Sequence, residues 1–394
     1  MPKMLTIEIA DPFGVGGGCY ATHAHIRAFS ELFNGQVDVC VPANSNKADS
    51  NLSIANLYRV GERSLFSKIC SVFSGDLHRY TKFVKKLIEK NDYEWCVCDG
   101  SISCSSLYRS LKKANIKIIS IHHNHEPEYF RDNTTNFMYK WFWLPYVKKA
   151  ERKAYLNSDI NIFLTKQDEK TFRNVYGPTK AFNAVLGTFE SSFNHDQIEI
   201  NHDYENEKKD SLVFVITGSL CNYQTIDGIV YFFENLYQFL PKQSRVVVAG
   251  RSPAEKLLVF LKKYKNVEIV ANPRNIESVV AQADVYVCPT RIGGGLKLRV
   301  MDGLRCGKAV ITHTCSARGY DAFENKNYFF VYKNPEEFRN CLLRYEKNKA
   351  NFLKEGIIAD YQKIFSYEAG KKRMEEIMNR YVQMSSDSNK DESA

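Results

Sequence analysis

Short apolar segments alternate with stretches of helical periodicity along most of the chain. In the first half, the apolar runs that predict strands lie at residues 5–10, 37–41, 95–98, 116–121 and 160–164. Helical patterns separate them, at residues 20–33, 82–90, 105–114 and 136–157. Parallel strands need crossover connections, which are usually helices, so this order predicts a parallel, doubly wound α/β sheet.

The second half repeats the same alternation. Strands are predicted at residues 212–217, 244–249, 267–270, 283–288 and 309–311. Helices are predicted at residues 227–239, 254–264 and 276–283, and from about residue 296. Residues 187–210, between the halves, are polar and highly charged, which is typical of a domain boundary.

We therefore expect two Rossmann-like domains of ordinary size that face a cleft. The first covers residues 1–187 and the second residues 188–365. An amphipathic helix at 366–383 is expected to pack back on the first domain, and the polar tail at 384–394 is expected to be disordered. Ligands of such sheets bind at the carboxyl ends of the strands.

Composition and charge narrow the classes of protein. Apolar residues make up 44% of the 394 residues, which indicates a globular chain. The 11 cysteines follow no spacing pattern, which argues against a disulfide framework or a zinc site and for a reducing cytosol. The N-terminus is too short and polar for a signal peptide, and no 18-residue apolar run predicts a membrane span. We therefore expect a cytoplasmic protein.

The formal charge of +9 leaves two interpretations open. The basic clusters at residues 82–90 and 148–153 fit either a solvated charged face or an anionic partner. The aromatic and basic segment at 139–149 fits a lipid interface as well as packing between helices. No nucleic-acid-binding motif accompanies the charge, so the anionic partner we expect is an inner-membrane surface and not a nucleic acid.

Three consecutive glycines, Gly293 to Gly295, join a predicted strand to a predicted helix that ends at Gly307. Free backbone N–H groups at such a helix start bind anions. Lys297 falls in the expected first turn, where the helix dipole disfavours a cation unless an anion such as a phosphate lies beside it.

Two charged residues fit a nucleotide at the same sheet edge. Arg251 follows a buried strand and Gly250, so it could join Lys297 on a pyrophosphate, or it could be a surface residue that caps a helix. Asp302 lies two helical turns beyond Gly295 and could accept hydrogen bonds from a ribose diol, or be a solvated helix carboxylate.

In the first half, polar residues also gather at strand ends. His123 is expected to face the cleft and to handle a proton near a reacting sugar, with Glu126 orienting it or capping the next helix. Adjacent histidines at a strand end usually point apart, so we expect no metal there and a structural role for at least one of the three histidines at 122–125. Asp99, Gly16, Gly17 and Gly18 are expected to line the cleft, where the glycines would let the backbone approach an acceptor or a donor phosphate closely.

The sequence of residues 293–312, followed by Ala317-Arg-Gly-Tyr320, resembles the donor-site signature of GT-B-fold, family 4 (group 1) retaining glycosyltransferases. The resemblance implies a donor site that contains Gly218, Gly294, Gly295 and Leu296. Within it, Arg251 and Lys297 would hold the diphosphate, and Asp302 would bind the ribose. His123 would face the donor sugar. The first glutamate of the family's motif falls at Gly294, so this chain departs from the motif at the residue that holds donor-sugar hydroxyls.

The implied reaction is transfer of a sugar from a UDP- or GDP-linked donor to an acceptor hydroxyl, without a metal or other cofactor. We expect the acceptor to be a glycan or lipid-linked glycan of a bacterial surface polysaccharide, such as O-antigen or capsule, and the enzyme to act at the inner membrane. Two alternatives share this architecture: a non-hydrolysing nucleotide-sugar epimerase, and a non-catalytic subunit that binds a glycan or a partner.

Overall fold

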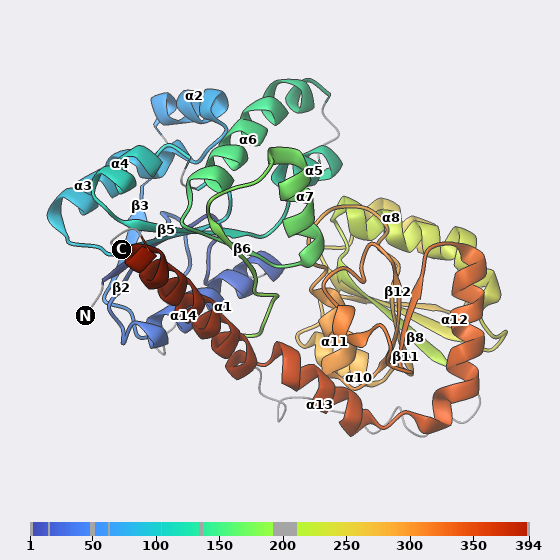
Figure 1. Cartoon of the computed structure of the whole chain (residues 1–394). Helices are drawn as coiled ribbons and strands as arrows, with labels where there is room; N and C mark the ends of the chain where they lie inside the picture. The colour runs from blue at the N-terminus through green and yellow to red at the C-terminus, as the bar shows by residue number, and fades with distance from the viewer. Residues whose placement is uncertain are drawn as a thin grey trace. The chain divides into compact units, whose positions relative to one another are not determined.

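The computed structural model describes residues 3–14, 16–47, 52–61, 64–103, 105–133, 137–191 and 211–391. The chain divides into two compact units, residues 1–192 with 365–394 and residues 193–364 (Figure 1). The sequence predicted boundaries at 187/188 and 365/366. Most of the predicted linker, residues 192–210, lies outside the described residues.

Unit 1 is built on a seven-stranded sheet with the order β3-β2-β1-β4-β5-β6-β7, in which every strand pair is parallel. Its strands are β1 Met4–Glu8, β2 Val37–Pro42, β3 Asn56–Val60, β4 Trp95–Asp99, β5 Lys117–His122, β6 Ile160–Phe163 and β7 Phe182–Val185. Its helices are α1 Gly17–Leu32, α2 Leu65–Ser74, α3 Thr81–Lys90, α4 Tyr108–Lys113, α5 Glu126–Asn133, α6 Phe137–Asn157, α7 Lys166–Tyr176 and α14 Tyr367–Asp391. The doubly wound arrangement predicted from the alternation is confirmed.

The two faces of this sheet carry separate cores because side chains alternate along each strand. One core packs residues such as Val39 and Ile119 against α1 and against Met374 of α14. The other packs residues such as Ile7 and Cys96 against α3 and α4. The last helix thus belongs to unit 1, although the second unit, residues 193–364, separates it from the rest in sequence.

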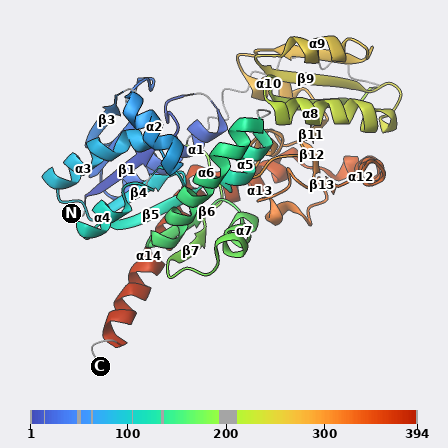
Figure 2. The ribbon, with the colours of Figure 1, turned by 90° about the horizontal axis from the view of Figure 1, so that it is seen from above.

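Unit 2 repeats the design with a six-stranded parallel sheet of order β10-β9-β8-β11-β12-β13. Its strands are β8 Val213–Ser219, β9 Arg245–Arg251, β10 Val267–Ala271, β11 Val285–Cys288, β12 Ala309–His313 and β13 Phe329–Tyr332. Its helices are α8 Tyr223–Tyr231, α9 Glu255–Leu261, α10 Ile276–Ala281, α11 Arg299–Arg305, α12 Pro335–Asn348 and α13 Lys354–Phe365 (Figure 2).

Strand order reverses once in each sheet, between β1 and β4 in unit 1 and between β8 and β11 in unit 2. Doubly wound sheets bind ligands outside the carboxyl ends of the strands at this switch point. In unit 1 those ends carry Glu8 and Asp99, which are direct partners in the β1–β4 pairing. In unit 2 they carry Ser219 and Cys288. Each unit therefore has a candidate binding site at the switch point of its sheet.

Three sequence predictions need correction. Helix α14 continues to Asp391, through most of the tail predicted to be disordered, and the Ser385 hydroxyl donates to the Tyr381 carbonyl of the preceding turn at 2.9 Å. The strand predicted at 116–121 runs instead from Lys117 to His122, and Glu126 already begins α5. Cys98 is disulfide-bonded, whereas the other described cysteines are free thiols as expected.

Candidate functional site

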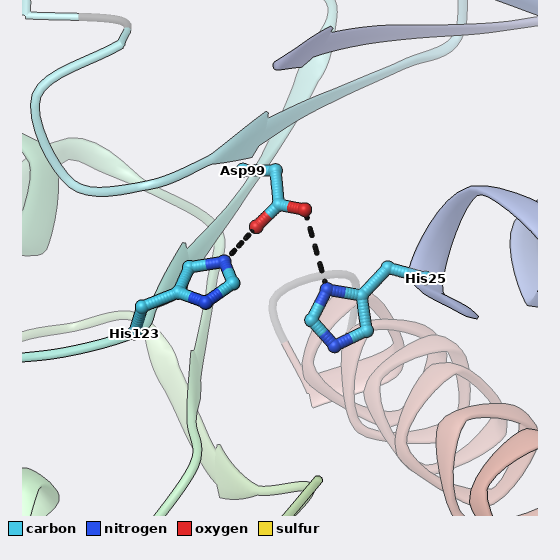
Figure 3. A group of neighbouring side chains, drawn as sticks. All are labelled: His25, Asp99 and His123. Carbon is cyan, nitrogen blue, oxygen red and sulfur yellow. Dashed lines mark hydrogen bonds and ion pairs between the residues drawn. The ribbon is translucent and has the colours of Figure 1, made fainter. Parts of the chain in front are cut away.

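The unit 1 site centres on the buried carboxylate of Asp99, the last residue of β4. His123, just after β5, hydrogen-bonds Asp99 Oδ1 through Nε2 (Figure 3). His25 of α1 approaches the other oxygen, with 3.3 Å between its Nδ1 and Asp99 Oδ2. Segments far apart in sequence thus bring two imidazoles to one carboxylate.

The charges of this group are coupled. Burial alone would raise the pKa of Asp99, but the imidazoles of His123 and His25 hold that pKa far below its ordinary value. Burial alone would lower the pKa of His123, yet the Asp99 charge and hydrogen bond raise it above its ordinary value. His123 therefore favours the protonated imidazolium, which donates hydrogen bonds to developing negative charge and is a poor general base.

Glu8 completes the group from β1. Its side chain is buried beside Asp99, and burial together with the Asp99 charge raises the pKa of Glu8 well above its ordinary value. A neutral Glu8 next to an ionised Asp99 is the pattern of two carboxyl groups that share one site. The sequence analysis missed both Glu8 and His25. The available signals were an acid at the end of an apolar strand and a histidine between Ala21 and Phe29 on the buried face of α1.

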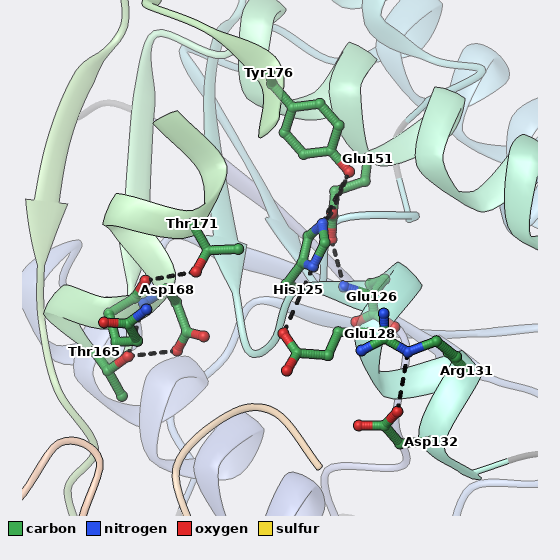
Figure 4. Close-up of polar contacts among 11 residues, drawn as sticks. His125, Glu126, Glu128, Arg131, Asp132, Glu151, Thr165, Asp168, Thr171 and Tyr176 are labelled. Atoms are coloured by element: carbon green, nitrogen blue, oxygen red, sulfur yellow. Dashed lines mark hydrogen bonds and ion pairs between the residues drawn. The ribbon is translucent and has the colours of Figure 1, made fainter. Parts of the chain in front are cut away.

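The other two histidines of the predicted cluster point elsewhere. His122 is fully buried, where Nδ1 lies 2.8 Å from Ser101 Oγ and Nε2 lies 2.9 Å from Asn161 Oδ1. Burial lowers the pKa of His122 to about 4, so it is the neutral, structural histidine that the sequence predicted. His125 faces Glu128 and Glu151 instead (Figure 4).

The His123 imidazole is hydrogen-bonded by Asp99, and Glu126 acts on it through its charge. Glu126 begins α5, and its backbone N–H donates to Glu151 Oε1 at 2.7 Å (Figure 4). Burial raises the pKa of Glu126 to about 7, against the opposing effect of His123. Burial and the neighbouring Glu126 also raise the pKa of Glu151, which accepts a hydrogen bond of 2.6 Å from the Tyr176 hydroxyl.

The glycines before α1 leave room at the same edge of unit 1. Gly16 precedes the helix with a positive φ of 144°, and Gly17 and Gly18 form part of its first turn. A Cβ atom placed on Gly16 or Gly18 would meet nothing within 4 Å. The loop therefore has space beside it, and the glycines are not required by internal packing.

The unit 2 site is a glycine loop folded around Lys297. The Lys297 ammonium donates to the carbonyls of Gly294 (2.8 Å) and Gly293 (3.2 Å) and to Gln224 Oε1 (3.3 Å). The side chain is buried, and this burial lowers its pKa, as do the charges of Arg299 and Arg318. An ammonium has three donors, so a phosphate must displace one of these contacts to bind Lys297.

Helix α11 begins later than the glycine pattern predicted. Its first residue is Arg299, and Leu296 and Lys297 belong to the preceding loop. Gly293 and Gly295 have positive φ values of 90° and 70°, and the Val300 N–H bonds the Lys297 carbonyl, which closes a tight turn before the helix. The Tyr320 hydroxyl holds the same carbonyl at 2.9 Å. Lys297 is therefore fixed by the loop and not by a helical turn.

Arg299 is the second cation of this site, and the sequence analysis did not identify it. Its Nη1 donates to Thr225 Oγ1 at 2.9 Å and to Thr290 Oγ1 at 3.3 Å. A Cβ on Gly218 would lie 2.8 Å from that nitrogen, so only glycine lets the guanidinium reach the end of β8. In the described part of the chain, neither Lys297 nor Arg299 contacts a carboxylate.

The two remaining predicted residues make no hydrogen bond or ion pair with Lys297 in the described part of the chain. Arg251 is exposed at the end of β9, and no hydrogen bond or ion pair joins it to Lys297 among the residues that the structure describes. Asp302 lies on α11, where it accepts a hydrogen bond of 3.2 Å from Thr217 Oγ1 and pairs with Arg305. Burial raises the pKa of Asp302. Its partner Thr217 belongs to β8, at the switch point.

Known proteins match both the second unit and the overall fold. Residues 211–348 match the family model described as Glycosyl transferases group 1. An uncharacterized glycosyltransferase of Methanocaldococcus jannaschii is 22% identical over 178 residues, which are 40% of this chain and 45% of that protein. The match therefore spans under half of that relative's length.

The chain also resembles solved structures over nearly its whole length. Sucrose-phosphate synthase from Thermosynechococcus elongatus has a TM-score of 0.73 at 13% identity, covering 98% of this chain and 100% of that one. Anabaena HepE in complex with UDP has a TM-score of 0.67 at 11% identity, covering 96% and 100%. The predicted two-sheet α/β fold is confirmed: residues 211–348 of the second unit match the group 1 glycosyltransferase model, in a chain with the fold of the GT-B glycosyltransferases.

Proposed function

We propose that this protein transfers a sugar from a nucleotide-sugar donor, bound by unit 2, to an acceptor hydroxyl. The observation that carries the proposal is the pair of Lys297 and Arg299 at the β8–β11 switch point, beside a glycine loop and without a carboxylate partner. Lys297 is buried and Arg299 is half-buried, and withdrawing such cations from water is costly unless an anion neutralises them. The two phosphate groups of a nucleotide sugar supply negative charges for this purpose. The protein cations would also stabilise the diphosphate as it leaves.

We assign the donor-binding residues from these two cations together with the donor-site signature at residues 293–312. Gly294, Gly295 and Leu296 would offer backbone groups to the donor, and Gly218 would leave room for it beside Arg299. We propose that Arg251 makes the second phosphate contact and that Asp302 binds the ribose. HepE, which shares the fold, was solved with UDP, and this favours a uridine nucleotide over a guanosine nucleotide. We propose retention of the anomeric configuration and catalysis without a metal, as the resemblance implies.

At the carboxyl edge of unit 1 we propose that His123 donates a hydrogen bond to the reacting sugar. The Asp99 carboxylate fixes this imidazole and favours its charged form. Gly16, Gly17 and Gly18 would let the acceptor approach the backbone closely. We propose a glycan or lipid-linked glycan acceptor of a surface polysaccharide, on the support of the +9 charge, which suits an anionic inner-membrane surface.

Calorimetric titration with UDP and GDP tests the donor site directly. In Lys297→Met we expect UDP affinity to fall about tenfold or more, because a charge-assisted contact to the diphosphate is lost. Lys262→Met is the matched control, since it removes one lysine charge from an exposed position of the same unit. Equal UDP affinity in wild type and Lys297→Met would exclude the proposed phosphate contact.

Incubation with a panel of UDP- and GDP-sugars distinguishes the three candidate activities. Slow release of free sugar and nucleoside diphosphate is expected for a transferase without acceptor. A new nucleotide sugar would identify an epimerase instead. Absence of both turnover and nucleotide binding would identify a binding subunit, an outcome that the glycine at 294 makes worth testing.

A further inference from the structure

Helix α2 of unit 1 presents its apolar face to solvent. Leu65, Phe66, Ile69, Val72 and Phe73 recur at helical spacing, and all five are exposed, Leu65 at 76% and Phe66 at 72%. The side turned to the protein carries Ser67 and Ser71 instead, which are buried, and the Ser71 hydroxyl accepts a hydrogen bond from the His78 backbone. This is the reverse of the usual amphipathic arrangement.

Folding of unit 1 alone gives no reason for this orientation. Burying one leucine or phenylalanine side chain contributes roughly 1.5–3 kcal/mol, so five exposed apolar residues forgo a large stabilisation. Contiguous apolar surface of this kind marks a site of interaction with a partner or a membrane. The Ser64 hydroxyl caps the helix at Ser67 N, which fixes its start in this orientation.

The apolar surface continues onto α6, which lies beside α2 (Figures 1 and 2). The rings of Phe73 and Tyr146 meet edge to face with centroids 6.1 Å apart. Phe142 lies one turn before Tyr146 on the same face of α6 and is 60% exposed, and its neighbour Trp141 is also exposed. We call these residues of α2 and α6, with Tyr146, the apolar face.

The two segments that form the apolar face carry charge of a single sign. Residues 64–75 and 137–150 contain no aspartate or glutamate. Lys68 on α2 and Lys148 and Lys149 on α6 are exposed. A second copy of the chain would place these like charges opposite one another, whereas anionic lipid headgroups complement them.

We propose that the apolar face is a membrane-docking surface that inserts into the interface of an anionic bilayer. No helix within the described residues is long and apolar enough to span a bilayer. Aromatic side chains would enter the headgroup region while the lysines meet anionic lipids. The proposal deepens the proposed function, because it assigns residues to the contact with the membrane. It rests on the proposed function only for the reason why the protein would bind a membrane.

Vesicle binding tests the surface without any donor or acceptor. We expect the full chain to co-sediment with phosphatidylglycerol-containing vesicles about tenfold more strongly than with purely zwitterionic vesicles. Phe66→Ser/Phe73→Ser should lose about tenfold or more of this binding. The matched control, Leu343→Ser/Leu353→Ser, changes two exposed leucines of unit 2 and should bind like the wild type. Trp141 should shift its emission to shorter wavelength on binding, and Trp141→Phe should remove most of that shift.

Two results would overturn the proposal. One is a failure of the vesicle assay: either the wild type does not bind anionic vesicles, or Phe66→Ser/Phe73→Ser binds them as strongly as the wild type. The other is a wild-type dimer in light scattering that the double variant abolishes while vesicles stay unbound, which would make the apolar face a contact between copies. UDP affinity of the double variant should match the wild type, so failure here is distinguishable from failure of the donor site.

Discussion

Asp99 shows how one side chain determines the chemistry of its neighbours. It contacts two imidazoles and lies beside the Glu8 carboxyl, and it stays ionised because His123 and His25 outweigh the effect of its burial. The same contact makes His123 a hydrogen-bond donor. The protonation state of His123 is therefore a property of the group and not of the histidine alone.

Replacing Asp99 with asparagine keeps the shape of the side chain and removes its charge. We expect the pKa of His123 to fall below its value in the wild type, because burial continues to disfavour the imidazolium after its charged partner is lost. NMR titration of the imidazole signals measures this. His313 of unit 2 is an internal control, whose pKa should not change. An unchanged or higher pKa for His123 would contradict the coupling.

At this scale the sequence predicted which residues stand at strand ends, but not their partners. Asp99 and His123 were both identified, each from its place after a buried strand. Their contact depends on β4 and β5 being adjacent, and the contact with His25 depends on how α1 packs over the sheet. Those are tertiary facts that no local pattern contains. Arg299 was missed because a helix cation next to Lys297 looks like an ordinary surface residue.

At the scale of elements, α11 packs closely on β11. Gly303 of α11 faces Tyr286 of β11, and a Cβ at Gly303 would lie 2.6 Å from the ring carbon Cγ. The Tyr286 hydroxyl in turn lies 2.6 Å from Thr217 Oγ1, the hydroxyl that donates to Asp302. The spacing between helix and strand therefore positions the Asp302 carboxylate.

Gly303→Ala tests this packing against intrinsic helix propensity. Alanine is the better helix former by about 1 kcal/mol, yet we expect the variant to lose roughly 1–3 kcal/mol because Tyr286 must move. Gly356→Ala is the matched control, since Gly356 is exposed in α13 and a Cβ there meets no atom closer than 3.8 Å. It should be neutral or slightly stabilising. Urea unfolding of both variants gives the comparison, and equal stability would refute the close-packing account.

The elements themselves were largely predictable, and their ends were not. The predicted strands of both sheets are present because apolar runs between helices leave few alternatives. Helix α11 starts at Arg299 and not at about Leu296, because loop carbonyls and Tyr320 hold Lys297 in a tight turn. Helix α2 was not predicted. Its apolar positions would be expected to be buried, whereas in the structure they are exposed.

At the scale of the whole molecule, the chain enters unit 2 once and returns to unit 1 through α14. The predicted packing of a helix at 366–383 on the first domain agrees with this return. The helix packs closely on unit 1, since a Cβ on Gly370 would lie 1.9 Å from Phe189 Cγ. Arg373 Nε donates to the Leu186 carbonyl at 2.8 Å. Unit 1 therefore requires the C-terminal segment to complete its core, and unit 2 does not.

This division predicts that a lesion in α14 unfolds one unit alone. Met374 is fully buried in the unit 1 core, so Met374→Asp buries a carboxylate without a partner and should destabilise unit 1 by about 3 kcal/mol or more. The three tryptophans, Trp95, Trp141 and Trp143, all belong to unit 1, so their emission during urea unfolding reports that unit. Hydrogen exchange at the β8 and β11 amides reports unit 2 and should stay unchanged.

The control for this variant is Asn379→Asp, which adds the same carboxylate to an exposed position of the same helix. Its tryptophan unfolding curve should match the wild type, because an exposed charge needs no desolvation. Loss of protection in both units of Met374→Asp would mean that they fold as one cooperative body. Because α14 supplies core residues to unit 1 and none to the β8–β11 sheet, we expect the two transitions to separate.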